Sequence, residues 1–150
     1  MATIHLTTLI HAPIDACFDA ARSVDAHLSS AHGTNEKVVA GRMSGLFEAG
    51  DVVTWEAKHL GIRQRLTVEI VRMSVPTYFE DRMVKGAFKS MLHEHHFVEE
   101  NGSTVMTDVF SYETPFGILG ILFDKLYLEN YMRKFLQKRN AHLKHMLEST

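Results

Sequence analysis

The last third of the sequence restricts the possible fold more than any other stretch. Residues 114–117 read Thr-Pro-Phe-Gly, and a long segment with regularly spaced apolar residues follows over 118–147. The spaced residues are Leu119, Leu122, Leu126, Met132, Leu136, Leu143 and Met146. Intervals of three and four place them on one face of a helix, which would be about 45 Å long at ~1.5 Å per residue. The rest of the chain must then provide the surface that buries this face.

Composition excludes several classes of protein. The 150 residues are 45% apolar and 23% charged, as in a globular protein, and the net charge of −2 gives no electrostatic basis for binding nucleic acid. A single cysteine rules out an internal disulfide. The most apolar window, 116–123, is too short to span a bilayer, and the N-terminus does not resemble a signal peptide. We therefore expect one domain over 1–150, located in the cytoplasm, without integral membrane association.

The first part of the chain predicts a strand followed by two short helices. Residues 3–11 alternate as a strand does, and Pro13 suits the first turn of a helix whose buried face includes Cys17. Ser23 can cap a second short helix that begins at Val24. Residues 31–35 are polar and contain glycine, which predicts a loop.

The middle of the chain predicts a series of strands. Turn signals at Leu60-Gly61, Val75-Pro76 and Asn101-Gly102 separate the alternating segments. The expected strands are 37–42, 52–59, 62–73, 77–85, 88–99 and 103–113. With the first strand and the long helix, this order predicts an α+β protein with an antiparallel sheet of about seven strands.

Several short sequence phrases resemble one known superfamily. They are His11-Ala12-Pro13, Phe18-Asp19-Ala20-Ala21-Arg22, Trp55-Glu56-Ala57-Lys58-His59, Gln64-Arg65-Leu66, Gly86-Ala87-Phe88, His93-Glu94-His95 and Tyr112-Glu113-Thr114-Pro115-Phe116-Gly117. The chain resembles the START-like, or SRPBCC, superfamily, and within it the bacterial polyketide cyclase/dehydrase-like branch. The resemblance covers nearly the whole chain. It implies a helix-grip fold, in which a curved antiparallel sheet wraps around a long C-terminal helix, with a pocket between the two. It does not name the ligand.

The hairpin around Asn101-Gly102 predicts which residues share a face of the sheet. Pairing Glu100 with Ser103 places His95 opposite Asp108 and His93 opposite Phe110, and alternation puts all four on one face. Aromatic and methionine content favours this face as the inward one. The predicted ligand-binding residues are Trp55, His59, Gln64, Leu66, Met83, Met91, His93, His95, Phe97, Asp108, Phe110 and Tyr112.

Three hypotheses compete for the polar members of this set. In the first, a buried hydrogen bond between His95 and Asp108 orients a hydrophobic or amphipathic ligand, lipid-like or polyketide-like, without reacting with it. In the second, His95 oriented by Asp108 is a general base, with His93 or Tyr112 as acid, in a cofactor-free cyclase, dehydratase or hydrolase. In the third, His93, His95 and Asp108, with or without His59, bind a metal ion. The first is favoured, so we expect no cofactor and no metal.

Further expectations concern the helix and the assembly. The inward face of the helix carries no evident acid or base, and Arg133, Lys134, Lys138 and Arg139 are expected to be solvated. Residues 116–121 surround Gly117 and Gly120, and they form either a mobile lip to the pocket or ordinary packing against the two short helices. A further alternative is an interaction module whose cavity is filled by its own side chains. We expect a monomer or a weak homodimer.

Overall fold

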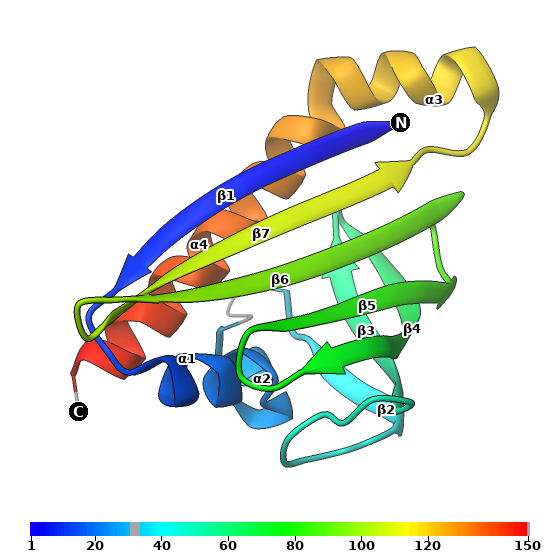
Figure 1. The fold of residues 1–150 in the computed structure, drawn as a ribbon. Coiled ribbons are helices and arrows are strands. Elements are labelled where there is room, and N and C mark those ends of the chain that lie inside the picture. The colour runs from blue at the N-terminus through cyan, green and yellow to red at the C-terminus, as the bar shows by residue number, and fades with distance from the viewer. Residues whose placement is uncertain (31–33, 150) are drawn as a thin grey trace.

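A seven-stranded antiparallel sheet curves around one long helix in the computed structural model (Figure 1), which describes residues 1–30 and 34–149. The expected loop at 31–35 therefore lies partly outside the described residues. The strands are β1 (Ala2–Ile10), β2 (Lys37–Gly41), β3 (Val52–His59), β4 (Ile62–Ser74), β5 (Tyr78–Lys85), β6 (Ser90–Glu100) and β7 (Ser103–Glu113). Their order in the sheet is β1-β7-β6-β5-β4-β3-β2. The helices are α1 (Ile14–Ala21), α2 (Val24–Ser30), α3 (Gly117–Phe123), a π-helical segment η1 (Asp124–Leu128) and α4 (Glu129–Glu148).

The predicted hairpin register is confirmed. Glu100 pairs with Ser103, His95 with Asp108 and His93 with Phe110. Asn101 and Gly102 both have positive φ, at 53° and 81°, which is the backbone conformation of the two-residue turn that the Asn-Gly pair favours. Alternate residues of β6 and β7 are buried, so the face predicted to point inward does so.

The two short helices begin as the sequence predicts. The backbone N–H of Ala26 donates to Ser23 Oγ over 3.1 Å, which confirms Ser23 as the cap of α2. Cys17 is fully buried on α1 and belongs to a core of aromatic and aliphatic side chains between α1, the β6–β7 hairpin and the end of α4. A second core lies between the middle of the sheet and the start of α4.

The C-terminal helix differs from the straight, buried helix that its spacing predicts. The helix changes direction at η1, where the hydrogen-bond pattern widens by one residue (Figure 1). Leu136 and Leu143 on α4 are buried as expected, whereas Leu119 and Leu126 are 74% and 76% exposed. The first part of the apolar stripe has therefore turned away from the sheet. The alternative that it packs against α1 and α2 is also wrong.

Candidate functional site: a cavity between sheet and helix

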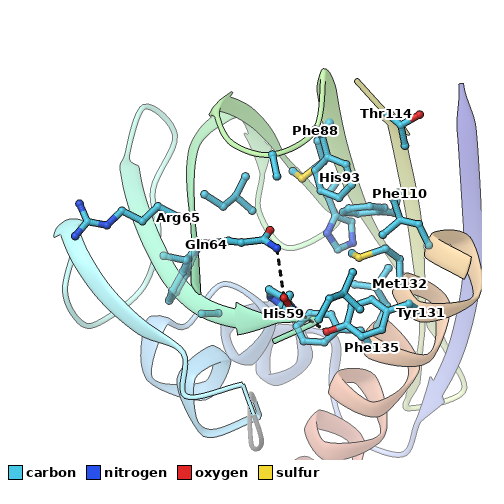
Figure 2. Close-up of a pocket in the computed structure, with 18 of the residues that line it drawn as sticks. His59, Gln64, Arg65, Phe88, His93, Phe110, Thr114, Tyr131, Met132 and Phe135 are labelled. Carbon is cyan, nitrogen blue, oxygen red and sulfur yellow. Dashed lines mark hydrogen bonds between the residues drawn. The ribbon is translucent and has the colours of Figure 1, made fainter. Parts of the chain in front are cut away.

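A cavity of about 620 Å³ lies between the concave face of the sheet and the C-terminal helix (Figure 2). Its walls are mainly apolar. The sheet contributes Trp55, Leu66, Val68, Met91 and Phe110, and the helix contributes Leu128, Met132, Phe135 and Leu136. The alternative of a cavity filled by its own side chains is therefore wrong. The volume falls within the range usual for small-molecule sites.

A polar group lies where the end of β3 meets α4. His59 Nδ1 and the hydroxyl of Tyr131 share a hydrogen bond of 2.8 Å, and the side-chain amide of Gln64 donates to the carbonyl of His59 over 3.4 Å (Figure 2). Burial lowers the pKa of His59, although the negative charge of Glu36 acts in the opposite direction. The neutral imidazole and the phenol can therefore bind the polar end of a ligand.

A second polar group lies on the side of the cavity formed by α2. The ring of His27 stacks on Trp55 at 4.1 Å and forms a short hydrogen bond with the carboxylate of Glu36. Burial acts to raise the pKa of Glu36, but its bond to His27 and the charge of Arg139 hold it below its ordinary value. Glu36, His27 and Arg139 all line the cavity, so this wall carries charges of both signs.

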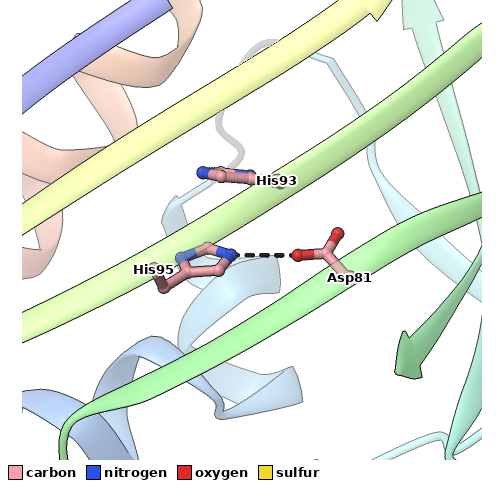
Figure 3. A group of neighbouring side chains, drawn as sticks. All are labelled: Asp81, His93 and His95. Carbon is pink, nitrogen blue, oxygen red and sulfur yellow. Dashed lines mark hydrogen bonds and ion pairs between the residues drawn. The ribbon is translucent and has the colours of Figure 1, made fainter. Parts of the chain in front are cut away.

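Two histidines and two carboxylates form a buried cluster at the inner wall. His93 Nε2 lies 2.7 Å from Asp108 Oδ1, and the other oxygen of Asp108 accepts from the side-chain amide of Asn140 on α4, also over 2.7 Å. His95 Nε2 lies 2.9 Å from Asp81 Oδ1 (Figure 3), and its ring stacks between Phe79 and His93. The cluster thus joins β5, β6, β7 and α4.

The cluster holds its members in defined charge states. Burial, followed by the neighbouring His95, lowers the pKa of His93 and favours its neutral form. Burial acts to raise the pKa of both carboxyls, but their hydrogen bonds to histidine and the nearby positive charges outweigh it and hold both pKa values low. Asp81 and Asp108 are therefore ionised near neutral pH.

The expected hydrogen bond between His95 and Asp108 is not formed. The two residues are paired across the strands, but the closest ring nitrogen, Nδ1 of His95, is 3.5 Å from Asp108 Oδ1. Stacking on Phe79 points His95 Nε2 at Asp81 on β5 instead, and Asp108 reaches diagonally to His93. Diagonal neighbours on a sheet are within reach of long side chains, so register alone does not select the partner.

Only part of the predicted set lines the cavity. Trp55, His59, Gln64, Leu66, Met91, His93 and Phe110 do so. His95 and Asp108 instead border a separate space of about 20 Å³, which has room for about one water. Phe97 packs in the core beside α1, and Met83 lies against Gly86 outside the cavity lining. Tyr112 is buried and donates its hydroxyl to Asp124 of η1, which fixes the bend of the helix.

The sequence interpretation missed several polar residues of the site. Asp81 lies on the inward face of β5 by simple alternation, and that signal could have identified it. Tyr131 and Arg139 come from the helix, so the expectation that its inward face carries no acid or base is wrong, as is the expectation of a solvated Arg139. Glu36 follows α2 outside any strand, and no sequence pattern indicates its position.

Asp81, His93 and His95 are the described residues best placed to hold a metal ion. One donor atom from each lies within 4.8 Å of the others (Figure 3). This set differs from the expected one, because Asp81 replaces Asp108 and His59 is bonded to Tyr131 elsewhere. Two observations oppose an ion here: both Nε2 atoms already face carboxylates, and Arg139 acts electrostatically on Asp81 and Asp108.

Comparison with known proteins identifies the fold. No family model matches the sequence, and no curated protein matches it. Solved structures do match. TTHA0849 from Thermus thermophilus is 18% identical with a TM-score of 0.80, covering 99% of this chain and 98% of that one. The chain has the helix-grip fold.

Two further solved structures show the same architecture. Ara h 8.0201 is 12% identical with a TM-score of 0.70, and 99% of each chain is covered. The major latex-like protein 151 of Panax ginseng is 15% identical with a TM-score of 0.68, and 97% of each chain is covered. At these sequence identities, the similarity between this chain and the two proteins shows a shared fold alone. No helix among the described residues is long and apolar enough to cross a bilayer.

Proposed function

We infer that this protein binds a hydrophobic or amphipathic small molecule in the cavity between the sheet and the C-terminal helix. The observation that carries the proposal is the cavity itself, about 620 Å³ with mainly apolar walls and a few polar groups. Water in such a space gains few hydrogen bonds, so an apolar ligand that displaces it is stabilised. The ligand-binding residues would be Trp55, His59, Gln64, Leu66, Met91, His93 and Phe110.

The polar groups favour a ligand with one or two polar ends. His59 with Tyr131 would bind one end, and His93 would face the other. Arg139 adds a positive charge that suits an acidic or phenolic group. A lipid-like or polyketide-like molecule has this character, in keeping with the superfamily branch that the sequence resembles.

The single tryptophan offers a direct test of binding. Trp55 lines the cavity, so its emission should fall as anilinonaphthalene sulfonate enters and accepts energy from it. Ala57→Phe places a ring inside the cavity and should weaken binding at least tenfold. Ala40→Phe on exposed β2 is the matched control and should bind as the wild type does.

Two results would refute the carrier proposal. One is an absence of saturable binding by the wild-type protein. The other is equal binding by Ala57→Phe and Ala40→Phe, which would place the probe on the surface. Native mass spectrometry of the purified protein provides a second measurement, because a carrier should show a co-purified apolar mass that is lost after denaturation.

One observation favours a second candidate, a cofactor-free cyclase, dehydratase or hydrolase. His93 lines the cavity with its Nε2 held by Asp108, and its lowered pKa keeps the imidazole neutral, as a general base requires. In this candidate His93 takes the role that the sequence suggested for His95. His93→Gln keeps a donor for Asp108 but removes the base, so it should abolish turnover of a bound substrate and leave probe binding within about threefold. Unchanged turnover would refute the catalytic role.

A further inference from the structure

The start of the C-terminal helix exposes an unusual amount of apolar surface. Eight large apolar side chains there are about half exposed or more. They are Phe116, Ile118, Leu119, Ile121, Leu122, Phe123, Leu126 and Tyr127. Phe116 and Ile118 are 84% and 83% exposed. A contiguous apolar surface of this kind on a folded protein indicates that something apolar covers it.

The directions of these side chains indicate what kind of partner could cover this apolar surface. Successive residues of a helix point about 100° apart, so the exposed apolar residues of α3 span an arc of about 200°. Gly120 is the buried residue of α3, and an added Cβ there would lie 1.9 Å from the carbonyl oxygen of Pro115 in the preceding linker. A second copy of the chain or another rigid protein covers a narrower stripe of a helix. A fluid apolar phase can surround the whole arc.

The charges of this segment suit the surface of a phospholipid bilayer. Residues 117–123 carry no charge, and Asp124 is tied to the sheet by the hydroxyl of Tyr112. Lys125 is exposed and can extend its ammonium group towards lipid phosphates while its methylenes remain in the apolar layer.

The apolar surface also forms one side of the cavity mouth. Phe116, just before α3, and Leu119 and Phe123 on α3 line the cavity. Leu60 and Ile62, at the turn between β3 and β4, also line it and are 39% and 63% exposed. In Figure 1, α3 lies at the end of the molecule opposite to α1 and the C-terminus. The mouth and the apolar helix therefore belong to one surface.

We propose that α3 and η1 dock this protein peripherally on a neutral phospholipid bilayer, with the cavity mouth facing the lipid. An apolar ligand can then pass between membrane and cavity without crossing water. The docking follows from the exposed helix, and only the passage of a ligand rests on the function proposed above.

Vesicle flotation tests the docking. The wild-type protein should float with phosphatidylcholine vesicles. Ile118→Gln/Leu122→Gln/Leu126→Gln changes three exposed residues that do not line the cavity, and it should reduce the floated fraction at least tenfold. The control Val75→Gln/Val84→Gln/Val98→Gln changes three valines of similar exposure elsewhere and should float as the wild type does. Thermal melts should show both variants folded. If the triple helix variant is not folded, Ile118→Gln alone takes its place.

Several outcomes would overturn the proposal. They are a wild-type protein that stays with the soluble fraction, a helix variant that floats as well as the control, and flotation that requires anionic lipid and disappears at high salt. A concentration-dependent dimer in sedimentation, abolished by the helix variant and accompanied by no flotation, would show that a second copy covers this surface. The cavity probe separates the two proposals, because flotation without probe binding leaves the docking intact and refutes the carrier function.

Discussion

Asp108 connects the sheet to α4 within the buried polar cluster. It accepts from Asn140 on α4 and pairs with His93 on β6 while its own side chain is almost completely buried. Alternation places Asp108 on the inward face, and this position could be predicted from the sequence. The choice of His93 rather than His95 depends on ring stacking and on Asp81 from a third strand.

Removing either side chain of the His93–Asp108 pair should show that the two interact. Asp108→Ala leaves a buried imidazole and a buried amide without their acceptor, so it should lower the free energy of unfolding by about 1–3 kcal/mol for each unsatisfied group. The double variant with His93→Ala should cost less than the sum of the single variants, by about 1–3 kcal/mol. Urea denaturation of all four proteins measures this coupling.

A distant residue provides the control cycle. Val98 is exposed and shares no partner with Asp108, so Val98→Ala and Asp108→Ala should add to within about 0.5 kcal/mol. If the His93 and Asp108 substitutions were equally additive, the contact between these two residues would make no specific contribution to the free energy of unfolding.

The bend at η1 divides the C-terminal helix into an exposed first part and a second part that packs against the sheet. Beyond the bend, Leu136 and Leu143 pack against the sheet, and before it the apolar residues stay exposed at the mouth. The three- and four-residue spacing continues through both parts, so periodicity alone predicts one buried face. The bend is held by Tyr112 on β7, which binds Asp124, a contact between residues on different elements.

Gly120 allows α3 to lie against the linker that precedes it. Gly120→Ala would place a methyl group 1.9 Å from the carbonyl oxygen of Pro115, so α3 must shift outward. We expect a loss of about 1–3 kcal/mol in the free energy of unfolding and faster release of the fluorescent probe from the widened mouth. Stopped-flow dilution measures the release.

Ile121→Ala is the control within the same helix. Ile121 is half exposed and does not line the cavity, so its loss should change stability by no more than about 0.5 kcal/mol. A comparable effect of the two substitutions would indicate that α3 is insensitive to its contact with the linker.

The buried cluster should make the whole molecule sensitive to acid. The pKa of His93 is lowered in the folded state, so the unfolded chain takes up a proton first as the pH falls below about 6.5. Stability should therefore decrease from pH 7 to pH 5, with a slope of at most about 1.4 kcal/mol per pH unit for each proton. Asp81 and Asp108 have lowered pKa values, and their contribution, present above about pH 4, is lost at still lower pH.

His93→Gln should reduce the slope between pH 5 and pH 7. Glutamine can still donate to Asp108 but does not titrate, and His59, whose pKa is also lowered, retains its own contribution. Urea denaturation at pH 5, 6 and 7 measures the difference. An unchanged slope in the variant would mean that His93 does not take up a proton preferentially in the unfolded chain.

Features that depend on local order could be predicted from the sequence alone. Asn101-Gly102 set the register of the hairpin because few residue pairs adopt two positive φ angles. Alternation then divided the hairpin residues between two faces, and aromatic and methionine content indicated the inward one. The partners and the burial of side chains depend on contacts between several elements, so they became evident only in the tertiary structure. Asp81 forms a hydrogen bond with His95, Arg139 lines the cavity, and Leu119 is exposed at the cavity mouth. The physical reason is that periodicity assigns a side chain to a face, whereas its partner and its burial depend on which other elements fold against that face.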